Sequence, residues 1–280
     1  MPATLTQDTC KPRKPWLSLL LSLITSGTGH IYNGSLKKGL ILCTVSIILG
    51  LIIPLFIGTF TGLAIGITAG LIFWLGVCID AWREARRQRD YELQRWNKWW
   101  VYLLVILFNI GAGTALESIV TAYSYEAFKA PSGSMLPTLQ IGDHFIAEIL
   151  GENEPVHRGD IIIFFNEEND VNFVKRIIGL PGETLSIKQQ VVFIDGQPLK
   201  EPYANHTKAH FFVPVRDNFA PVTLDTDEYF VMGDNRENSY DSRWLGPVKR
   251  QDITARTKYI YFPGDMESEG WLDRFGEIIR

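Results

Sequence analysis

Residues 39–57 read GLILCTVSIILGLIIPLFI, from Gly39 to Ile57, and carry no charged side chain. A run of about 20 apolar residues is long enough to cross the hydrocarbon core of a bilayer as a helix. Gly62–Ile79 meets the same condition, and so does Trp99–Tyr123, whose only charged residue is Glu117. The sequence therefore predicts three membrane-spanning helices in the first part of the chain.

An earlier apolar stretch, Trp16–Ile31, is weaker because Gly27, Gly29 and His30 interrupt it. It predicts a short re-entrant or interfacial helix, and four full spans is the alternative. Three cationic residues precede it, as in a signal peptide, but no small-residue cleavage site follows. We expect this stretch to remain part of the membrane anchor.

Basic residues decide the predicted orientation. The loop 82–98 carries Arg83, Arg86, Arg87, Arg89, Arg95 and Lys98. Loops rich in Lys and Arg stay on the cytoplasmic side. The helix that begins at Trp99 then delivers everything after about Tyr125 to the outer side. We predict a multi-span anchor over residues 1–125 and an extracytoplasmic domain over 126–280.

The net charge of −4 averages a basic, apolar first part and an acidic, polar second part, and nothing in it suggests a nucleic-acid partner. The three cysteines, Cys10, Cys43 and Cys78, all lie in the first part. The outer domain is therefore predicted to have neither a disulfide nor a thiolate metal site.

After residue 140 the pattern changes to short runs rich in Ile, Val, Phe and Tyr, separated by turn residues such as Asp195-Gly196. Such spacing is typical of an all-β domain. The expected strands are Phe145–Leu150, Asp160–Phe165, Phe173–Ile178, Val191–Ile194, Phe211–Val215, Tyr229–Met232 and Lys258–Phe262.

A serine-rich loop follows the last apolar run. It reads PSGSMLPTL from Pro131 to Leu139, and its prolines favour an extended, rigid backbone. A serine nucleophile needs a base, and the histidines of this domain form no recognisable triad motif. Lys175, in the apolar run Asn172–Gly179, is the other candidate. Burial would have to lower its pKa from about 10.4 toward 7–8.

A third segment, Gly233–Arg243, alternates acids, amides and arginines. It does not follow the spacing of a calcium-binding loop. The pattern favours a satisfied polar network that orients Lys175 through Ser239 and braces Arg176.

These three segments, in this order, resemble the nucleophile, lysine and final boxes of the type I signal peptidase family, the bacterial leader peptidases. The resemblance covers residues from about 128 to 262. It implies a mainly β catalytic domain of the signal peptidase type behind an α-helical anchor of three to four helices. Residues 27–34, followed by Lys37-Lys38-Gly39, also resemble the two-helix TM2 domain. The family usually has one or two spans before the nucleophile, so the longer anchor is a departure.

Residue roles follow from the same resemblance. It implies Ser134 as nucleophile and Lys175 as general base, without metal or cofactor. Ser132 would support the oxyanion and Ser239 the lysine, while Arg176, Asp241 and Arg243 would form structural salt bridges. Met135, Leu139 and Val174 would line shallow pockets for small side chains.

The resemblance also implies a setting. The substrates would be preproteins with signal peptides, cut at the outer face of a bacterial cytoplasmic membrane among lipid and in contact with the export machinery.

Other classes remain open. The chain could be a related Ser–Lys peptidase specialised for one substrate, such as a pilin precursor. Self-cleaving Ser–Lys repressors are soluble and bind DNA, so the membrane runs argue against that class. A non-catalytic membrane scaffold would not need both Ser134 and Lys175. A penicillin-binding enzyme is disfavoured because its Ser-x-x-Lys pattern occurs only at Ser35–Lys38, in a predicted cytoplasmic loop.

Overall fold

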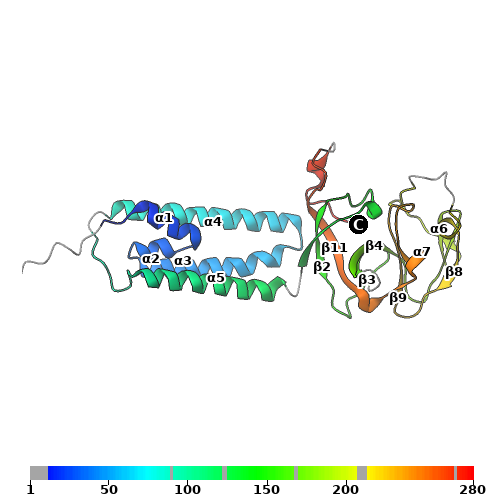
Figure 1. Cartoon of the computed structure of the whole chain (residues 1–280), viewed down its shortest axis with the longest axis horizontal. Coiled ribbons are helices and arrows are strands. Elements are labelled where there is room, and N and C mark those ends of the chain that lie inside the picture. The colour runs from blue at the N-terminus through cyan, green and yellow to red at the C-terminus, as the bar shows by residue number, and fades with distance from the viewer. Residues whose placement is uncertain (1–11, 89–90, 122–124, 167–169, 207–212, 268–269) are drawn as a thin grey trace, which may run out of the picture. The chain divides into compact units, whose positions relative to one another are not determined.

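The computed structural model describes residues 12–88, 91–121, 125–166, 170–206, 213–267 and 270–280. The chain divides into two compact units, one of residues 1–57 and 61–123 and the other of residues 58–60 and 124–280. The first is helical and the second is mainly β-sheet (Figure 1).

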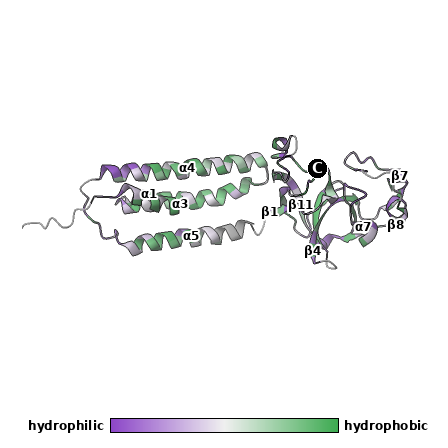
Figure 2. Ribbon diagram, turned by 45° about the horizontal axis from the view of Figure 1, so that its top comes forward, coloured by the Kyte–Doolittle hydropathy of each residue, from purple (hydrophilic) through white to green (hydrophobic). Residues whose placement is uncertain are grey.

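The helical unit contains α1 (Pro15–Ile24), α2 (Thr28–Tyr32), α3 (Leu36–Ile52), η1 (Ile53–Phe56), α4 (Phe60–Arg87) and α5 (Trp99–Thr121). Two helical segments, Leu36–Phe56 and Phe60–Arg87, are long and apolar enough to cross a membrane by length and composition. Figure 2 shows that α4 is hydrophobic over most of its length and hydrophilic in its last turns. The described apolar part of α5, Trp99–Ala115, is shorter, so a third span stays a prediction.

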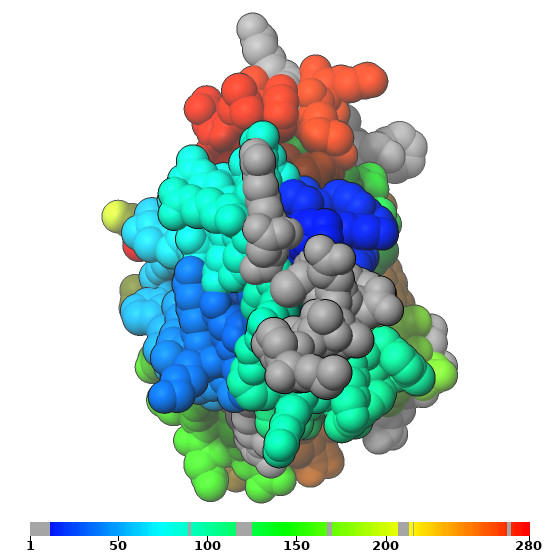
Figure 3. Space-filling view, turned by 90° about the vertical axis from the view of Figure 1, so that its left-hand side faces the viewer, coloured from blue at the N-terminus to red at the C-terminus, as the bar shows by residue number. Residues whose placement is uncertain are grey.

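The stretch Trp16–Ile31 forms two short helices. Gly27 separates α1 from α2 with a φ of 94°, which an L side chain rarely adopts. A Cβ there would also meet Gly39 O of α3, so the glycine permits a close approach. Ser18 Oγ of α1 and Asn33 Nδ2, just after α2, both donate to Ala81 O of α4. Seen end-on in Figure 3, the start of α1 lies beside the last turns of α4.

The second unit holds two antiparallel sheets. The seven-stranded sheet has the order β1-β2-β11-β3-β4-β9-β10, and the four-stranded sheet has the order β7-β6-β5-β8. The strands of the first are β1 (Tyr125–Lys129), β2 (His144–Ile149), β3 (Ile161–Asn166), β4 (Val171–Gly179), β9 (Glu228–Met232), β10 (Val248–Lys249) and β11 (Ile253–Phe262). Those of the second are β5 (Thr184–Lys188), β6 (Val191–Ile194), β7 (Gln197–Pro198) and β8 (Phe219–Thr223).

Most of the expected strands are confirmed, and the expected Asp195-Gly196 turn joins β6 to β7. The strand expected at Phe211–Val215 is wrong where the structure describes it. Pro214 opens the short helix α6 (Pro214–Asp217) instead, because the fixed φ of proline suits the first position of a helix. Residues 211 and 212 lie outside the described residues.

Other short helices of the described residues in this unit are η2 (Gly133–Met135), α7 (Ser242–Leu245) and η3 (Arg250–Asp252). After β11 the chain forms the single turn η4 (Trp271–Arg274). Beyond it the chain returns to the sheet, where Ile278 pairs with Tyr259.

Three clusters of buried side chains hold in place the strands of the β unit and the serine-rich loop. One cluster of buried side chains joins the serine-rich loop to β2, β3 and β11 through Met135, Leu139, Phe145 and Ile163. A second lies around Ile162, Ile177 and Val231, and a third around Leu185 and Phe230. β4 therefore runs through the middle of packed structure, between β3 and β9.

Candidate active site

The serine-rich loop makes one tight turn. Ser132 is extended, and η2 follows over Gly133–Met135. Met135 and Leu139 are buried in the core, so they anchor the loop on either side of Pro137. Ser132 Oγ and Ser134 Oγ lie 3.4 Å apart on the accessible side. The loop thus holds two hydroxyls close together.

Lys175 reaches this loop from β4. It pairs with Ile162 of β3, and its side chain is only 3% exposed. Its Nζ lies 2.9 Å from Ser134 Oγ and donates to Val174 O at 2.9 Å. The Phe173 ring stands 5.3 Å from the same nitrogen. The structure therefore brings Ser134 and Lys175, 41 positions apart in the chain, within hydrogen-bonding distance.

Burial changes the chemistry of this amine. Removal from water disfavours the charged form and lowers the pKa of Lys175 to about 8, against the opposing attraction of the Asp241 and Asp234 carboxylates. At pH 7 Lys175 is then neutral in roughly a tenth of the protein molecules, compared with less than a thousandth for an ordinary lysine. A neutral amine at this position can accept a proton from Ser134.

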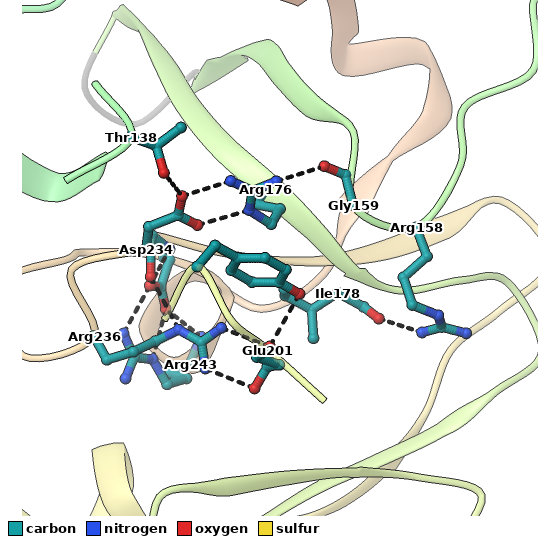
Figure 4. A network of polar contacts seen from close by, with 12 residues as sticks. Thr138, Arg158, Gly159, Arg176, Ile178, Glu201, Asp234, Arg236 and Arg243 are labelled. Atoms are coloured by element: carbon teal, nitrogen blue, oxygen red, sulfur yellow. Dashed lines mark hydrogen bonds and ion pairs between the residues drawn. The ribbon is translucent and has the colours of Figure 1, made fainter. Parts of the chain in front are cut away.

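The third segment forms a buried ionic network, part of which Figure 4 shows. Arg176 donates two hydrogen bonds to Asp234, from Nε to Oδ1 at 2.7 Å and from Nη2 to Oδ2 at 2.6 Å. Thr138 Oγ1 donates to the same carboxylate at 2.5 Å. Asp234 therefore ties the serine-rich loop to β4.

Arg176, Asp241 and Arg243 each take part in an ion pair. Asp241 pairs with Arg243, through contacts of 2.8 Å, and also accepts from Gly233 N. Arg176 pairs with Asp234, which belongs to the Gly233–Arg243 segment that was expected to brace it. In the sequence, Asp234 is marked only by its position beside Gly233 in the third segment. Nothing in the local sequence distinguishes it from the other acids of that segment.

Ser239 does not make the expected hydrogen bond to Lys175. Lys175 Nζ is engaged by Ser134 Oγ and Val174 O, and the Ser239 hydroxyl is buried without a hydrogen-bond partner among the described residues. It nevertheless lies close to the nucleophile. A Cβ on Gly233 would stand 2.2 Å from Ser239 Oγ and 2.5 Å from Ser134 O, so only glycine allows this approach.

Two hollows meet at Ser134 and Lys175. A pocket of about 240 Å³ is lined by Met135, Leu139 and Val174, together with Phe173. A more polar hollow of about 430 Å³ extends from the same serine and lysine toward Asn238 and Tyr240. A substrate peptide bound across Ser134 would have the apolar pocket on one side of that serine and the more polar hollow on the other.

A different set of side chains has metal-ligand spacing. Among the described residues, His30, Asp80 and Glu84 of the helical unit bring their ligand atoms within 4.8 Å of one another. Lys38 Nζ already lies 2.6 Å from Asp80 Oδ2, so an ammonium group neutralises part of that cluster.

The family profile described as signal peptidase, peptidase S26, matches residues 95–262. A signal peptidase I of Leptolyngbya laminosa is 36% identical over 179 residues, which cover 61% of this chain and 81% of that protein. One of Bacillus amyloliquefaciens is 34% identical over 172 residues, covering 60% and 87%. A crystal structure of a signal peptidase I from Enterococcus faecalis V583 shares 32% identity, covers 37% of this chain and 97% of that one, and has a TM-score of 0.33. The chain belongs to the signal peptidase family, peptidase S26.

Proposed function

We propose that this signal peptidase removes signal peptides from exported preproteins, with Ser134 as nucleophile and Lys175 as general base. The observation that carries the proposal is the 2.9 Å approach of a buried lysine amine to the Ser134 hydroxyl. Nucleophile and base within hydrogen-bonding distance are the geometric signature of covalent catalysis by a serine. A serine–lysine pair is a recognised variant of the catalytic triad.

The reaction divides into two halves. Neutral Lys175 takes the proton of Ser134 as Oγ attacks the scissile carbonyl carbon, and the charge on the carbonyl oxygen is stabilised by Ser132 Oγ and Ser134 N–H. Collapse breaks the C–N bond, and the ammonium of Lys175 returns the proton to the leaving amine. Water, deprotonated by the same lysine, then hydrolyses the ester. Each oxyanion donor is worth about 3 kcal/mol in such sites.

The apolar pocket supports the choice of substrate. Met135 and Leu139 are almost fully buried and line it, and Val174 lies beside the base. Apolar walls around a volume of about 240 Å³ suit small uncharged side chains, such as alanine, on the acyl side of the cleaved bond. In the family to which the chain belongs, signal peptides carry such residues before the cleavage site.

For the anchor we propose three spans, with the basic loop in the cytoplasm and residues 126–280 outside. α5 has 23 residues and a length of about 35 Å at 1.5 Å per residue, which is enough to cross a core of about 30 Å. α1 has ten residues and reaches only about 15 Å, which favours three spans over four. The catalytic domain would then work among lipids at the outer face, where the export machinery delivers its substrates.

Cleavage of a signal-peptide-bearing preprotein by the full-length chain in detergent tests the proposal. Ser134→Ala and Lys175→Met should each lose activity by at least a thousandfold. Ser186→Ala and Lys188→Met, which remove the same residue types from β5, should retain it. Full activity in either dyad variant would show that the assignment is wrong.

A further inference from the structure

The side chain of Asn235 reaches across to the serine-rich loop. It is 5% exposed, and its Nδ2 donates to Gly133 O at 2.9 Å. Its backbone N–H donates to Ser134 O at 3.1 Å. One residue therefore holds the carbonyl oxygens of the two peptide groups that flank the Ser134 side chain.

Holding Gly133 O also sets the direction of Ser134 N–H. Both groups belong to one planar trans peptide, in which the C=O and N–H bonds point in opposite directions. With the oxygen directed at Asn235, the Ser134 N–H must point away from it. Ser134 is the second residue of η2, and N–H groups in the first turn of a helix have no partner within the helix. Among the described residues, no backbone acceptor outside the helix binds this N–H either, so it can bind an anionic oxygen.

We propose that Asn235 is a positioning residue that aims the Ser134 N–H at the oxyanion of the tetrahedral intermediate. The inference rests on the function proposed above and assigns a role to Asn235, which has no hydrogen bond to Ser134 Oγ or Lys175 Nζ among the described residues. An oxyanion donor is effective only when its N–H is directed at the position that the charged oxygen will occupy. A small rotation of the Gly133–Ser134 peptide would lose that alignment while leaving Ser134 and Lys175 in place.

The surroundings of Asn235 favour this role over a purely structural one. Its Oδ1 is buried and has no hydrogen-bond partner among the described residues, so the side chain is retained at the cost of an unsatisfied acceptor. Backbone bonds fix the segment independently, from Asn205 N to Asp234 O at 2.7 Å and from Arg236 N to Asn205 O at 3.0 Å. Gly133 O keeps a longer bond from Leu136 N at 3.3 Å. Loss of Nδ2 should therefore loosen one peptide and leave the loop folded.

The first test is steady-state cleavage of the preprotein by the full-length chain. Asn235→Ala should lower kcat by about 10- to 100-fold, up to the effect of losing one oxyanion donor, with KM within threefold of wild type. Asn235→Asp, which places an acceptor against Gly133 O, should lower kcat at least as much. Ser242→Ala is the matched control, because it removes the buried hydrogen bond that Ser242 Oγ accepts from Val231 N at 2.9 Å and leaves the serine-rich loop unchanged. It should retain wild-type kcat.

The second test separates alignment from general damage. A peptide aldehyde bearing the acyl-side sequence adds to the serine and forms an oxyanion-bearing adduct. Its inhibition constant should rise in Asn235→Ala by the same factor as kcat/KM falls. Binding of an uncleaved peptide, measured with and without Asn235→Ala in a Ser134→Ala background, should not change.

The inference is overturned if Asn235→Ala keeps wild-type kcat and aldehyde affinity. It is equally overturned if Ser242→Ala loses as much activity, or if peptide binding weakens by the same factor as kcat/KM. Full activity of Ser134→Ala alone would overturn the proposed function as well, so the two failures are distinguishable.

Discussion

The buried amine of Lys175 should destabilise the folded protein, and Lys175→Met should remove that cost. The pKa of Lys175 falls from 10.5 to about 8 on folding because burial disfavours the ammonium form. At 1.36 kcal/mol per pKa unit, this difference amounts to about 3 kcal/mol. The penalty is fully present below pH 8, where the lysine is protonated in both the folded and the unfolded state.

The sign of the pH dependence follows from proton binding. Between pH 8 and pH 10.5 the unfolded chain binds more protons at Lys175 than the folded chain does, so wild-type stability rises with pH across this window. Methionine does not titrate. It also lacks the two 2.9 Å contacts of Nζ, and the loss of these contacts changes the stability by an amount that does not depend on this titration. The stability of Lys175→Met relative to wild type should therefore fall by about 3 kcal/mol from pH 7 to pH 10.5.

Pulse proteolysis of the full-length chain in urea and detergent measures this difference, since it reports the unfolded fraction of the catalytic unit at each pH. Lys188→Met, a substitution at the exposed end of β5, controls for the loss of a lysine at the surface. A stability difference between Lys175→Met and wild type that stays constant from pH 7 to pH 10.5 would refute the reasoning.

Three further results are expected. The kcat/KM of wild type for the preprotein should rise about tenfold per pH unit below pH 8 and level off above it, because only neutral Lys175 is a base; a flat profile from pH 6 to pH 9 would contradict this assignment. Asp234→Asn should cost about 3–5 kcal/mol in pulse proteolysis, since it leaves the buried Arg176 cation without its carboxylate; a loss below 1 kcal/mol would contradict the importance of that pair. Leu139→Ala should widen the apolar pocket and improve the cleavage of preproteins with valine in place of alanine before the cleaved bond, relative to the alanine substrate. Competition between the two substrates measures this ratio, and an unchanged ratio would place the pocket elsewhere.

Much of this molecule could be predicted from local patterns. Uncharged runs such as Gly39–Ile57 form apolar helices because length and hydropathy are properties of a segment. Alternating Ile, Val and Phe between turn residues indicates strands for the same reason. The two short helices in place of Trp16–Ile31 were harder to foresee, because the break at Gly27 depends on how closely α3 approaches.

Local sequence patterns do not predict features that depend on contacts between distant parts of the chain. Ser134 and Lys175 stand out in the sequence only through the order of their motifs. Their 2.9 Å contact, and the burial that lowers the pKa of Lys175, exist only because β4 lies inside a packed sheet. Hydrogen bonds between side chains depend on distances across the fold, which residue types along one segment do not specify.

By itself, the sequence determined the apolar helices, the β-rich second half and the candidate residues, because each depends on residues close together in the chain. The tertiary structure alone decided which acid neutralises Arg176, that Ser239 makes no hydrogen bond to Lys175, and that Asn235 holds Gly133 O. Those partners are 58 to more than 100 positions apart or depend on the packing of whole loops, so only the folded chain brings them within reach.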